Sequence, residues 1–322
     1  MSFKVPFRKT IFRLLLAIAV GVCFTPLVAL AQVNTFTNDQ TITTDNDDQP
    51  GQKFGGNNLT FEINSGISFT RQGQNSITVD DTSGATIIIN SGATLAAGYK
   101  NGNPKKNAIN ADNGVNLTVT NSGTISAASS VAIKLNGTSA AQITNNAGGS
   151  IFATQQTIVG NAGTANATIT NSGDIYISQQ SNAIDFDTVS GATITNNAGG
   201  TIRNEGGTGA VVYIGSSSTV TNSGTIRHHS FNPTANYWSI RADGDNNTII
   251  LKDEGKVFGL IEAQSGTSGN KLQFDHGFGR SYFYVTKGNF TLEDLSGNTV
   301  LKGSAGSVSL ARQETVDEML GL

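Results

Sequence analysis

Two carboxylic acids separated by one residue are the side chains in this sequence best placed for acid–base chemistry. Asp185 and Asp187 follow Ile184 in a stretch where apolar and polar residues alternate, which predicts a β-strand with both acids on its outer face. Their Cα atoms would lie about 6.6 Å apart. Carboxyl groups at such a spacing can serve an inverting glycosidase, so a polysaccharide-degrading enzyme is one hypothesis for the chain.

The neighbouring positions weaken this hypothesis. Lys134 and Arg241 fall at equivalent positions two repeats to either side, which predicts a face with acidic and basic groups. Val159, Val212 and Ile214 lie nearby and interrupt any continuous polar groove. We therefore favour a solvated strand face, and we predict no catalytic residue and no enzyme activity.

Histidine and acidic residues form no recognisable metal-binding pattern. His228 and His229 are adjacent in a predicted loop, which we interpret as a solvated loop tip, and His276 precedes a glycine further on. Three histidines without a cysteine in the exported chain do not have the spacing of zinc ligands. Two acidic clusters, Asp243-Gly-Asp245 and residues 45–48, lack the twelve-residue calcium loop. We interpret them as turns and predict no metal and no cofactor.

One loop is the best candidate for contact with a partner. The segment from His228 to Trp238 is longer than its counterparts and contains Phe231, Tyr237 and the only tryptophan of the sequence. Exposed aromatic side chains on a polar surface are common where proteins bind sugars or other proteins. Alternatively, the insertion folds back over the core. We predict that Phe231, Tyr237 and Trp238 form a binding site.

These candidates are positioned by an internal repeat. The strings Thr118-Val-Thr-Asn-Ser-Gly-Thr-Ile125 and Gln142-Ile-Thr-Asn-Asn-Ala-Gly-Gly-Ser-Ile151 alternate along the chain. Their asparagines step by 24, 26, 25 and 26 residues: Asn121, Asn145, Asn171, Asn196 and Asn222. A second apolar mark keeps the same spacing at Ile109, Ile133, Ile158, Ile184, Val211 and Ile240. A third mark follows each asparagine at Ile125, Ile151, Ile175, Ile202 and Ile226.

Each repeat therefore contains three short strands, which cannot bury an apolar face alone. Stacking the repeats lets each strand pair in parallel with its counterpart, which predicts an all-β parallel β-helix of about eight coils. The general crossover preference predicts that it is right-handed. Asparagine and glycine suit sharp corners because both tolerate positive φ, and stacked asparagines would bond along the axis. A β-sandwich is the alternative, but it does not explain the constant spacing.

The ends of the chain depart from the repeat. Residues 1–31 have the basic start, the apolar run and the small residues before the cut of a signal peptide. We then expect an N-terminal cap at 32–60, the β-helix at 61–268 and a β-rich junction at 269–308. Residues 309–322 predict an amphipathic helix with Ser309 as its N-cap.

Charge excludes one class of partner. Removal of the leader leaves 16 basic and 23 acidic residues, a net charge of −7. Such a balance argues against nucleic acid and against anionic membranes. We expect export across the inner membrane, followed by residence at the cell surface or outside it, or in the periplasm without further transport.

The order of these segments resembles that of an autotransporter passenger domain. The Ile-Thr-Asn-Ser-Gly-Thr-Ile coils are similar to those of many passengers, the stretch Phe278–Asn298 resembles the β-rich junction, and Ser309–Leu320 lies where the family has a linker helix. The resemblance implies an outer-membrane barrel translocator as a partner, although this sequence ends before any barrel strand. It also implies an adhesin or stalk that contacts host or bacterial surface molecules. The other hypotheses are the enzyme above and the product of a truncated or split gene.

Overall fold

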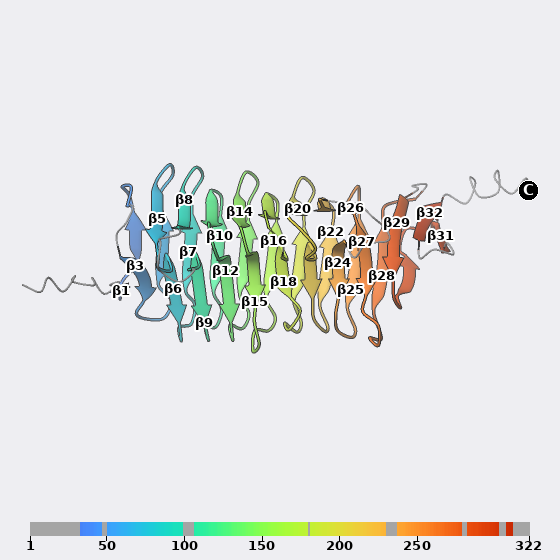
Figure 1. Cartoon of the computed structure of the whole chain (residues 1–322), viewed down its shortest axis with the longest axis horizontal. Coiled ribbons are helices and arrows are strands. Elements are labelled where there is room, and N and C mark those ends of the chain that lie inside the picture. The colour runs from blue at the N-terminus through green and yellow to red at the C-terminus, as the bar shows by residue number, and fades with distance from the viewer. Residues whose placement is uncertain are drawn as a thin grey trace, which may run out of the picture. The chain divides into compact units, whose positions relative to one another are not determined.

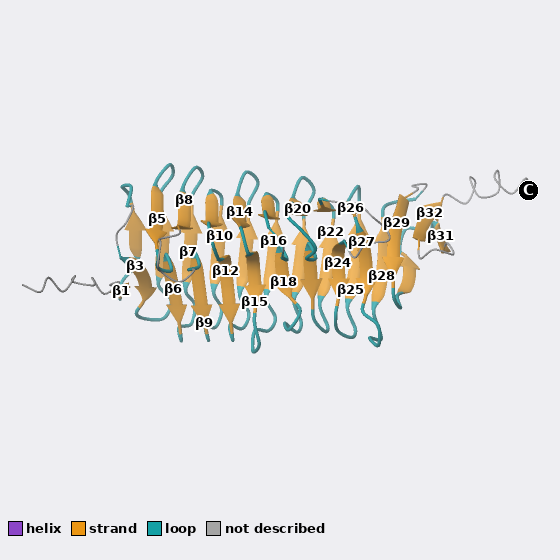
Figure 2. Ribbon diagram, viewed as in Figure 1, coloured by secondary structure: helices purple, strands orange, loops and turns teal. Residues whose placement is uncertain are grey.

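Each repeat forms three short strands, and each strand pairs with its equivalent in the next repeat. The computed structural model describes residues 33–46, 50–98, 106–179, 181–229, 237–278, 282–302 and 307–311, and every regular element in these ranges is a β-strand (Figure 2). Figure 1 shows strands of successive coils side by side, from β1 to β32. Within the same ranges, no helix has the length and apolar character needed to span a membrane.

Sheet A has 13 strands and runs through every coil. In spatial order they are β1 (Val33–Phe36), β3 (Gly51–Phe54), β6 (Ile77–Asp80), β9 (Ile109–Asp112), β12 (Val131–Asn136), β15 (Gln156–Gly160), β18 (Ile184–Phe186), β21 (Val212–Ile214), β24 (Trp238–Ala242), β27 (Leu260–Ala263), β29 (Tyr282–Lys287), β32 (Ser307–Ala311) and β31 (Thr299–Lys302).

Sheets B and C complete each coil. Sheet B contains β2 (Gln40–Ile42), β4 (Thr60–Ile63), β7 (Thr86–Ile89), β10 (Thr118–Asn121), β13 (Gln142–Asn145), β16 (Thr168–Asn171), β19 (Thr193–Asn196), β22 (Thr219–Asn222), β25 (Thr248–Lys252), β28 (Lys271–Asp275) and β30 (Thr291–Asp294). Sheet C contains β5 (Ser68–Gln72), β8 (Thr94–Gly98), β11 (Thr124–Ala127), β14 (Ser150–Ala153), β17 (Asp174–Ile177), β20 (Thr201–Asn204), β23 (Thr225–His228) and β26 (Lys256–Phe258). The fold is thus a parallel β-solenoid of about 8 turns, which confirms the predicted fold class.

The apolar marks of the repeat form one continuous core. Inward positions alternate with outward ones along the strands of sheets B and C, as in β10 and β11, and the core extends from Phe36 to Tyr284. Ile125, Ile151 and Ile175 pair in register in sheet C, each with no exposed surface. One assignment was wrong by a residue, because Val212 and not Val211 pairs with both Ile184 and Ile240. Burial of equivalent side chains in every coil provides the main stabilisation of the solenoid.

The five repeat asparagines form a buried ladder between sheets B and C. Each amide Nδ2 donates to the Oδ1 of the next asparagine at 2.8 Å, from Asn121 through Asn145, Asn171 and Asn196 to Asn222. All five side chains are 0% exposed. The predicted bonding along the axis is therefore confirmed.

The reason for the asparagines differs from the one predicted. Positive φ values occur at Gly148 and Gly199 in the two longer corners, whereas the ladder asparagines are not among the described residues with positive φ. Asparagine is placed there because its side chain both donates and accepts, so one column satisfies buried backbone and amide groups together. Asn171 Nδ2, for example, also reaches the carbonyl oxygens of Gly173 and Thr201 at 3.1 Å each.

Both ends of the solenoid lie further out than the repeat indicated. β1 pairs in parallel with β3, and β2 with β4, so coiling begins within the segment expected to be a cap. At the other end β28 and β30 still pair in parallel, and the first antiparallel pairing joins β29 to β32. Ser309 lies in β32, so the helix does not begin there with Ser309 as its N-cap. Residues 312–322, the remainder of that prediction, are outside the described residues.

Candidate functional site

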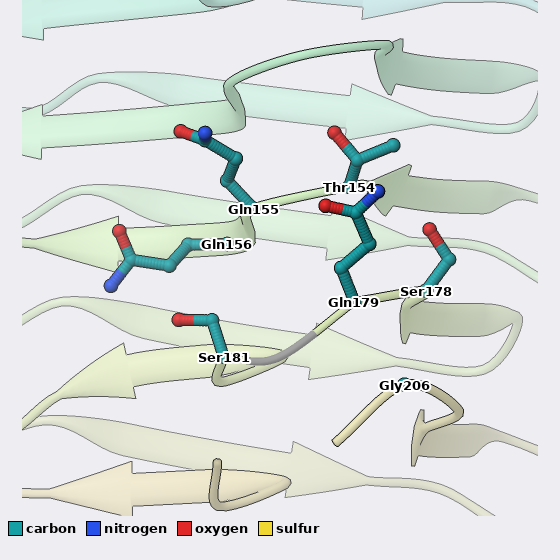
Figure 3. A pocket seen from close by; sticks show the side chains of 7 residues that line it. All are labelled: Thr154, Gln155, Gln156, Ser178, Gln179, Ser181 and Gly206. Carbon is teal, nitrogen blue, oxygen red and sulfur yellow. The ribbon is translucent and has the colours of Figure 1, made fainter. Parts of the chain in front are cut away.

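A polar pocket lies at the corner where sheet C gives way to sheet A. Its volume is about 710 Å³, and it spans the turns of three successive coils. Figure 3 shows the lining residues: Thr154, Gln155, Gln156, Ser178, Gln179, Ser181 and Gly206. Every side chain in the lining is an amide or a hydroxyl, so the pocket carries hydrogen-bonding groups without formal charge.

Strand register places these groups in adjacent coils. β14 pairs with β17, with Ala153 opposite Ile177, so Thr154 and Ser178 begin equivalent turns about 4.8 Å apart along the axis. The third turn approaches closely because it has a glycine. A Cβ on Gly206 would lie 2.3 Å from the Cα of Gln179, so any larger residue would displace the backbone.

A buried carboxylate is attached to the pocket through one glutamine. Gln156 Nε2 donates to Asp185 Oδ2 at 2.5 Å, and Asn182 Nδ2 donates to the same oxygen at 2.8 Å. Asp185 is 9% exposed, and its Oδ1 is buried without a hydrogen-bond donor in normal geometry. Burial raises the pKa of Asp185, and the bonds from Asn182 and Gln156 oppose that shift. Burial of a carboxyl group with few hydrogen-bond donors costs free energy when the group is charged.

Replacement of Asp185 by asparagine is expected to stabilise the protein at neutral pH. Because burial raises the pKa in the folded state, the folded chain binds the proton more tightly than the unfolded chain. The stability of the wild-type chain therefore falls as the pH rises from the unfolded pKa through the folded pKa. Asparagine keeps an oxygen for Gln156 and Asn182 without the charge, so the gain should vanish in strong acid.

Urea denaturation between about pH 3 and pH 8 measures this difference. Asp187→Asn, at the exposed position just beyond β18, is the matched control: it removes only the smaller contribution that the Asp187 charge makes to the raised pKa of Asp185, so it should change the slope less than Asp185→Asn does. An Asp185→Asn variant that is less stable than wild type at neutral pH would contradict the assignment of burial as the dominant cause.

The border of the pocket on sheet C is an aromatic stack, which lies one outward position before the lining residues Thr154 and Ser178. The rings of Phe152 and Tyr176 lie 4.8 Å apart with an interplanar angle of 9°, and the guanidinium carbon of Arg203 lies 4.4 Å from the Tyr176 ring centroid. Arg203 is held in place by Asp174, with bonds of 3.0 and 2.6 Å. Burial raises the pKa of Tyr176. Because outward side chains alternate, Phe152 and Tyr176 share the face of Thr154 and Ser178.

The outer column of sheet A contains the acids and bases singled out from the sequence. Lys134 pairs with Val159, Val159 with Asp185, Asp185 with Tyr213, and Tyr213 with Arg241. The prediction that Lys134 and Arg241 lie two coils to either side of Asp185 is confirmed. Val212 and Ile214 face inward, which corrects their predicted place on this face.

Arg241 is engaged within its own coil and the preceding one. Its guanidinium lies 3.3 Å from Asp243 Oδ1, and the Tyr213 hydroxyl donates to Asp243 Oδ2 at 2.8 Å. Burial, followed by this hydrogen bond, raises the pKa of Tyr213. The predicted carboxylate pair is also unequal, because Asp185 is buried whereas Asp187 is exposed. Arg241 and Tyr213 are therefore engaged with Asp243, and Asp185 is the buried acid of this outer column.

The predicted aromatic site is divided between two environments. Tyr237 packs on His228 and His229, with ring centroids 4.8 and 5.7 Å away. Trp238 begins β24, and the guanidinium carbon of Arg241 lies 4.6 Å from the centroid of its ring. Both aromatic side chains are half-buried. Phe231 lies outside the described residues.

The prediction that His228 and His229 form a solvated loop tip is wrong for His228. It ends β23 with 2% of its surface exposed, and its Nε2 lies 3.1 Å from the Gly209 carbonyl oxygen. The register explains this placement, because His228 pairs with Asn204, the inward residue of the preceding coil. Sequence alone did not reveal that β23 extends to this residue before the loop begins.

The described residues of the two acidic clusters accept backbone hydrogen bonds at turns. Asp45 Oδ1 accepts the Ser68 backbone N–H at 2.8 Å, and Asp245 Oδ1 accepts that of Ser268 at 2.6 Å. Among the described residues, no group of three or more histidine, cysteine or acidic side chains is arranged to hold a metal ion.

The corner pocket is not among the sites that the sequence predicts. The signal was a doubled string in consecutive coils, Thr154-Gln-Gln-Thr157 and Ser178-Gln-Gln-Ser181, at the turn between sheets C and A. Comparison of the chain with protein-family models, with curated proteins and with solved structures gives no match.

Proposed function

We propose that this chain is an exported, surface-exposed β-solenoid that binds other molecules through its outer faces and corners and catalyses no reaction. The observation that carries the proposal is the continuous core from Phe36 to Tyr284, which fills the interior of the coils and leaves the outside for recognition. The leader-like residues 1–31 support export. The resemblance to an autotransporter passenger supports an adhesin or stalk, with a membrane barrel translocator supplied as a partner.

The adhesin proposal is tested by measuring whether binding requires the predicted aromatic residues Tyr237 and Trp238. The purified exported chain is expected to bind extracellular-matrix proteins or intact cells, and the double variant Tyr237→Ala, Trp238→Ala is expected to bind at least tenfold more weakly. Aromatic side chains dominate the binding energy of many protein interfaces, which is the basis of this expectation. Surface plasmon resonance on immobilised matrix proteins and flow cytometry with labelled protein measure the two cases.

Phe258→Ala is the matched control, because Phe258 is 47% exposed on sheet C. It should bind like the wild type. Absence of binding by all three proteins would remove the adhesin proposal, whereas equal binding by all three would remove the aromatic residues from it.

A polysaccharide-degrading enzyme is the second candidate, and one observation favours it. The raised pKa of the Asp185 carboxyl is the property that a general acid requires. Release of reducing ends from neutral or acidic polysaccharides, lost in Asp185→Asn, would establish this activity in place of a purely binding role.

A further inference from the structure

We infer that the corner pocket formed by Thr154, Gln155, Gln156, Ser178, Gln179 and Ser181 binds a neutral saccharide unit. This site goes beyond the proposed function, because it is separate from Tyr237 and Trp238 and names a class of ligand. The inference rests on the composition of the pocket, on its aromatic border and on the buried acid behind it.

The lining selects for a ligand rich in hydroxyl groups. Glutamine amides and serine or threonine hydroxyls each provide donors and acceptors, which match sugar hydroxyls that also do both. The lining contains no charged side chain, so it offers no ion pair to a phosphate, a carboxylate or an ammonium group. A volume of about 710 Å³ lies within the range of small-molecule sites, yet the polarity differs from the mostly apolar lining that drug-like ligands prefer.

The border supplies the apolar contact that a sugar ring also needs. Phe152 and Tyr176 precede Thr154 and Ser178 by two residues each, so their side chains emerge about 6.6 Å away on the same face. Both rings are half-buried, and their parallel stacking fixes them as one wall. Phe152 and Arg203 cover the two faces of the Tyr176 ring, so the C–H groups of a saccharide would contact the ring edges while its hydroxyls face the amides.

Asp185 fixes the orientation of one amide in the pocket. A carboxylate only accepts, so Gln156 must direct its Nε2 toward Asp185 Oδ2, as the 2.5 Å contact shows. The amide then offers its Oε1 to a ligand donor. The carboxylate is itself held by Asn182, so Gln156 is positioned before a ligand arrives. A preorganised polar group loses less entropy on binding than a mobile one.

Gln155 and Gln179 provide a variant that separates binding from folding. They occupy equivalent places in successive turns and both line the pocket, and Gln179 is exposed. The purified wild-type chain and the double variant Gln155→Ala, Gln179→Ala are probed on an array of neutral oligosaccharides with glucose, galactose, mannose and N-acetylhexosamine ends, together with sialylated and sulfated counterparts. Gln142→Ala, an exposed glutamine on the outer face of sheet B, is the matched control.

The expected result is binding to one or more neutral oligosaccharides, weakened at least tenfold in the double variant and unchanged in Gln142→Ala. Thermal unfolding followed by circular dichroism should give the same midpoint for all three proteins. No neutral binding, binding restricted to acidic glycans, or equal binding by the double variant would overturn the inference. Matrix-protein and cell binding, measured on the same preparations, tests the proposed function independently, because it can persist when the array gives no signal.

Discussion

Replacement of Asn171 by alanine is expected to lower the free energy of unfolding by about 3 kcal/mol, because it leaves buried polar atoms without partners in the middle of the ladder. Asn171 Oδ1 accepts from Asn145 Nδ2 at 2.8 Å, and its Nδ2 donates to Asn196 Oδ1 at 2.8 Å. Alanine removes both bonds. Asn145 Nδ2 keeps weaker contacts with Gly149 and Asp174 carbonyls, but Asn196 Oδ1 loses its donor in the ladder.

The loss of stability in Asn171→Ala comes from the buried Asn196 Oδ1 that loses its donor. It does not arise because this position in the coil requires a polar side chain. The residues that pair with the two ends of the ladder are Ile89 and Leu251, and both are buried. An apolar side chain is thus compatible with this position of a coil when the neighbouring coils need no hydrogen bond from it. A buried acceptor that has lost its donor cannot recover water, so the penalty is larger than the net value of one hydrogen bond.

Urea denaturation followed by far-ultraviolet circular dichroism measures the loss. Asn197→Ala is the matched control, because Asn197 follows a ladder residue, is half-buried and makes one side-chain bond, to Ser172 Oγ at 2.9 Å. It should cost less than about 1 kcal/mol. Equal denaturation midpoints for Asn171→Ala and Asn197→Ala would show that the ladder contributes no more than a surface contact.

The spacing of the repeat was sufficient to predict the sheets, because pairing in a solenoid follows from equivalent positions. Ile125, Ile151 and Ile175 keep intervals of 26 and 24 residues and pair as the spacing requires. The asparagine ladder could be predicted for the same reason. The error at Val211 arose where the interval lengthens, because Val211 and Val212 are both apolar and spacing alone cannot choose between them.

The corner pocket was harder to predict from the sequence than the sheets, because it depends on which side chains of a turn point to solvent. Gln155 and Gln179 are ordinary polar turn residues when each coil is considered alone, and only stacking brings them together. Asp185 presents the opposite case. Its type and its outward position were evident, but its burial depends on Gln156 and Asn182, which reach it from a neighbouring strand and from a turn.

Replacement of Gly173 by alanine is expected to destabilise the protein by about 3 kcal/mol or more, because the added methyl group overlaps the backbone of the preceding coil. A Cβ at this position would lie 2.2 Å from the Gly149 carbonyl oxygen and 2.6 Å from that of Asn146. Both atoms belong to a backbone that pairs on either side, so neither can move without disturbing the stack. The Gly173 N–H also lies 3.3 Å from Asn171 Oδ1, which connects this corner to the ladder.

Gly199→Ala is the comparison that distinguishes the two reasons for glycine at a corner. One reason is the overlap of a Cβ with the preceding coil, and the other is a backbone with positive φ. Gly199 has φ +83°, and a Cβ there would meet nothing within 4 Å, so alanine should cost only about 1–2 kcal/mol of backbone strain. The denaturation midpoints of the two variants, measured under one set of conditions, decide between the two causes. If Gly173→Ala proves no more costly than Gly199→Ala, the close approach between coils is not the main demand for glycine at the Gly173 corner.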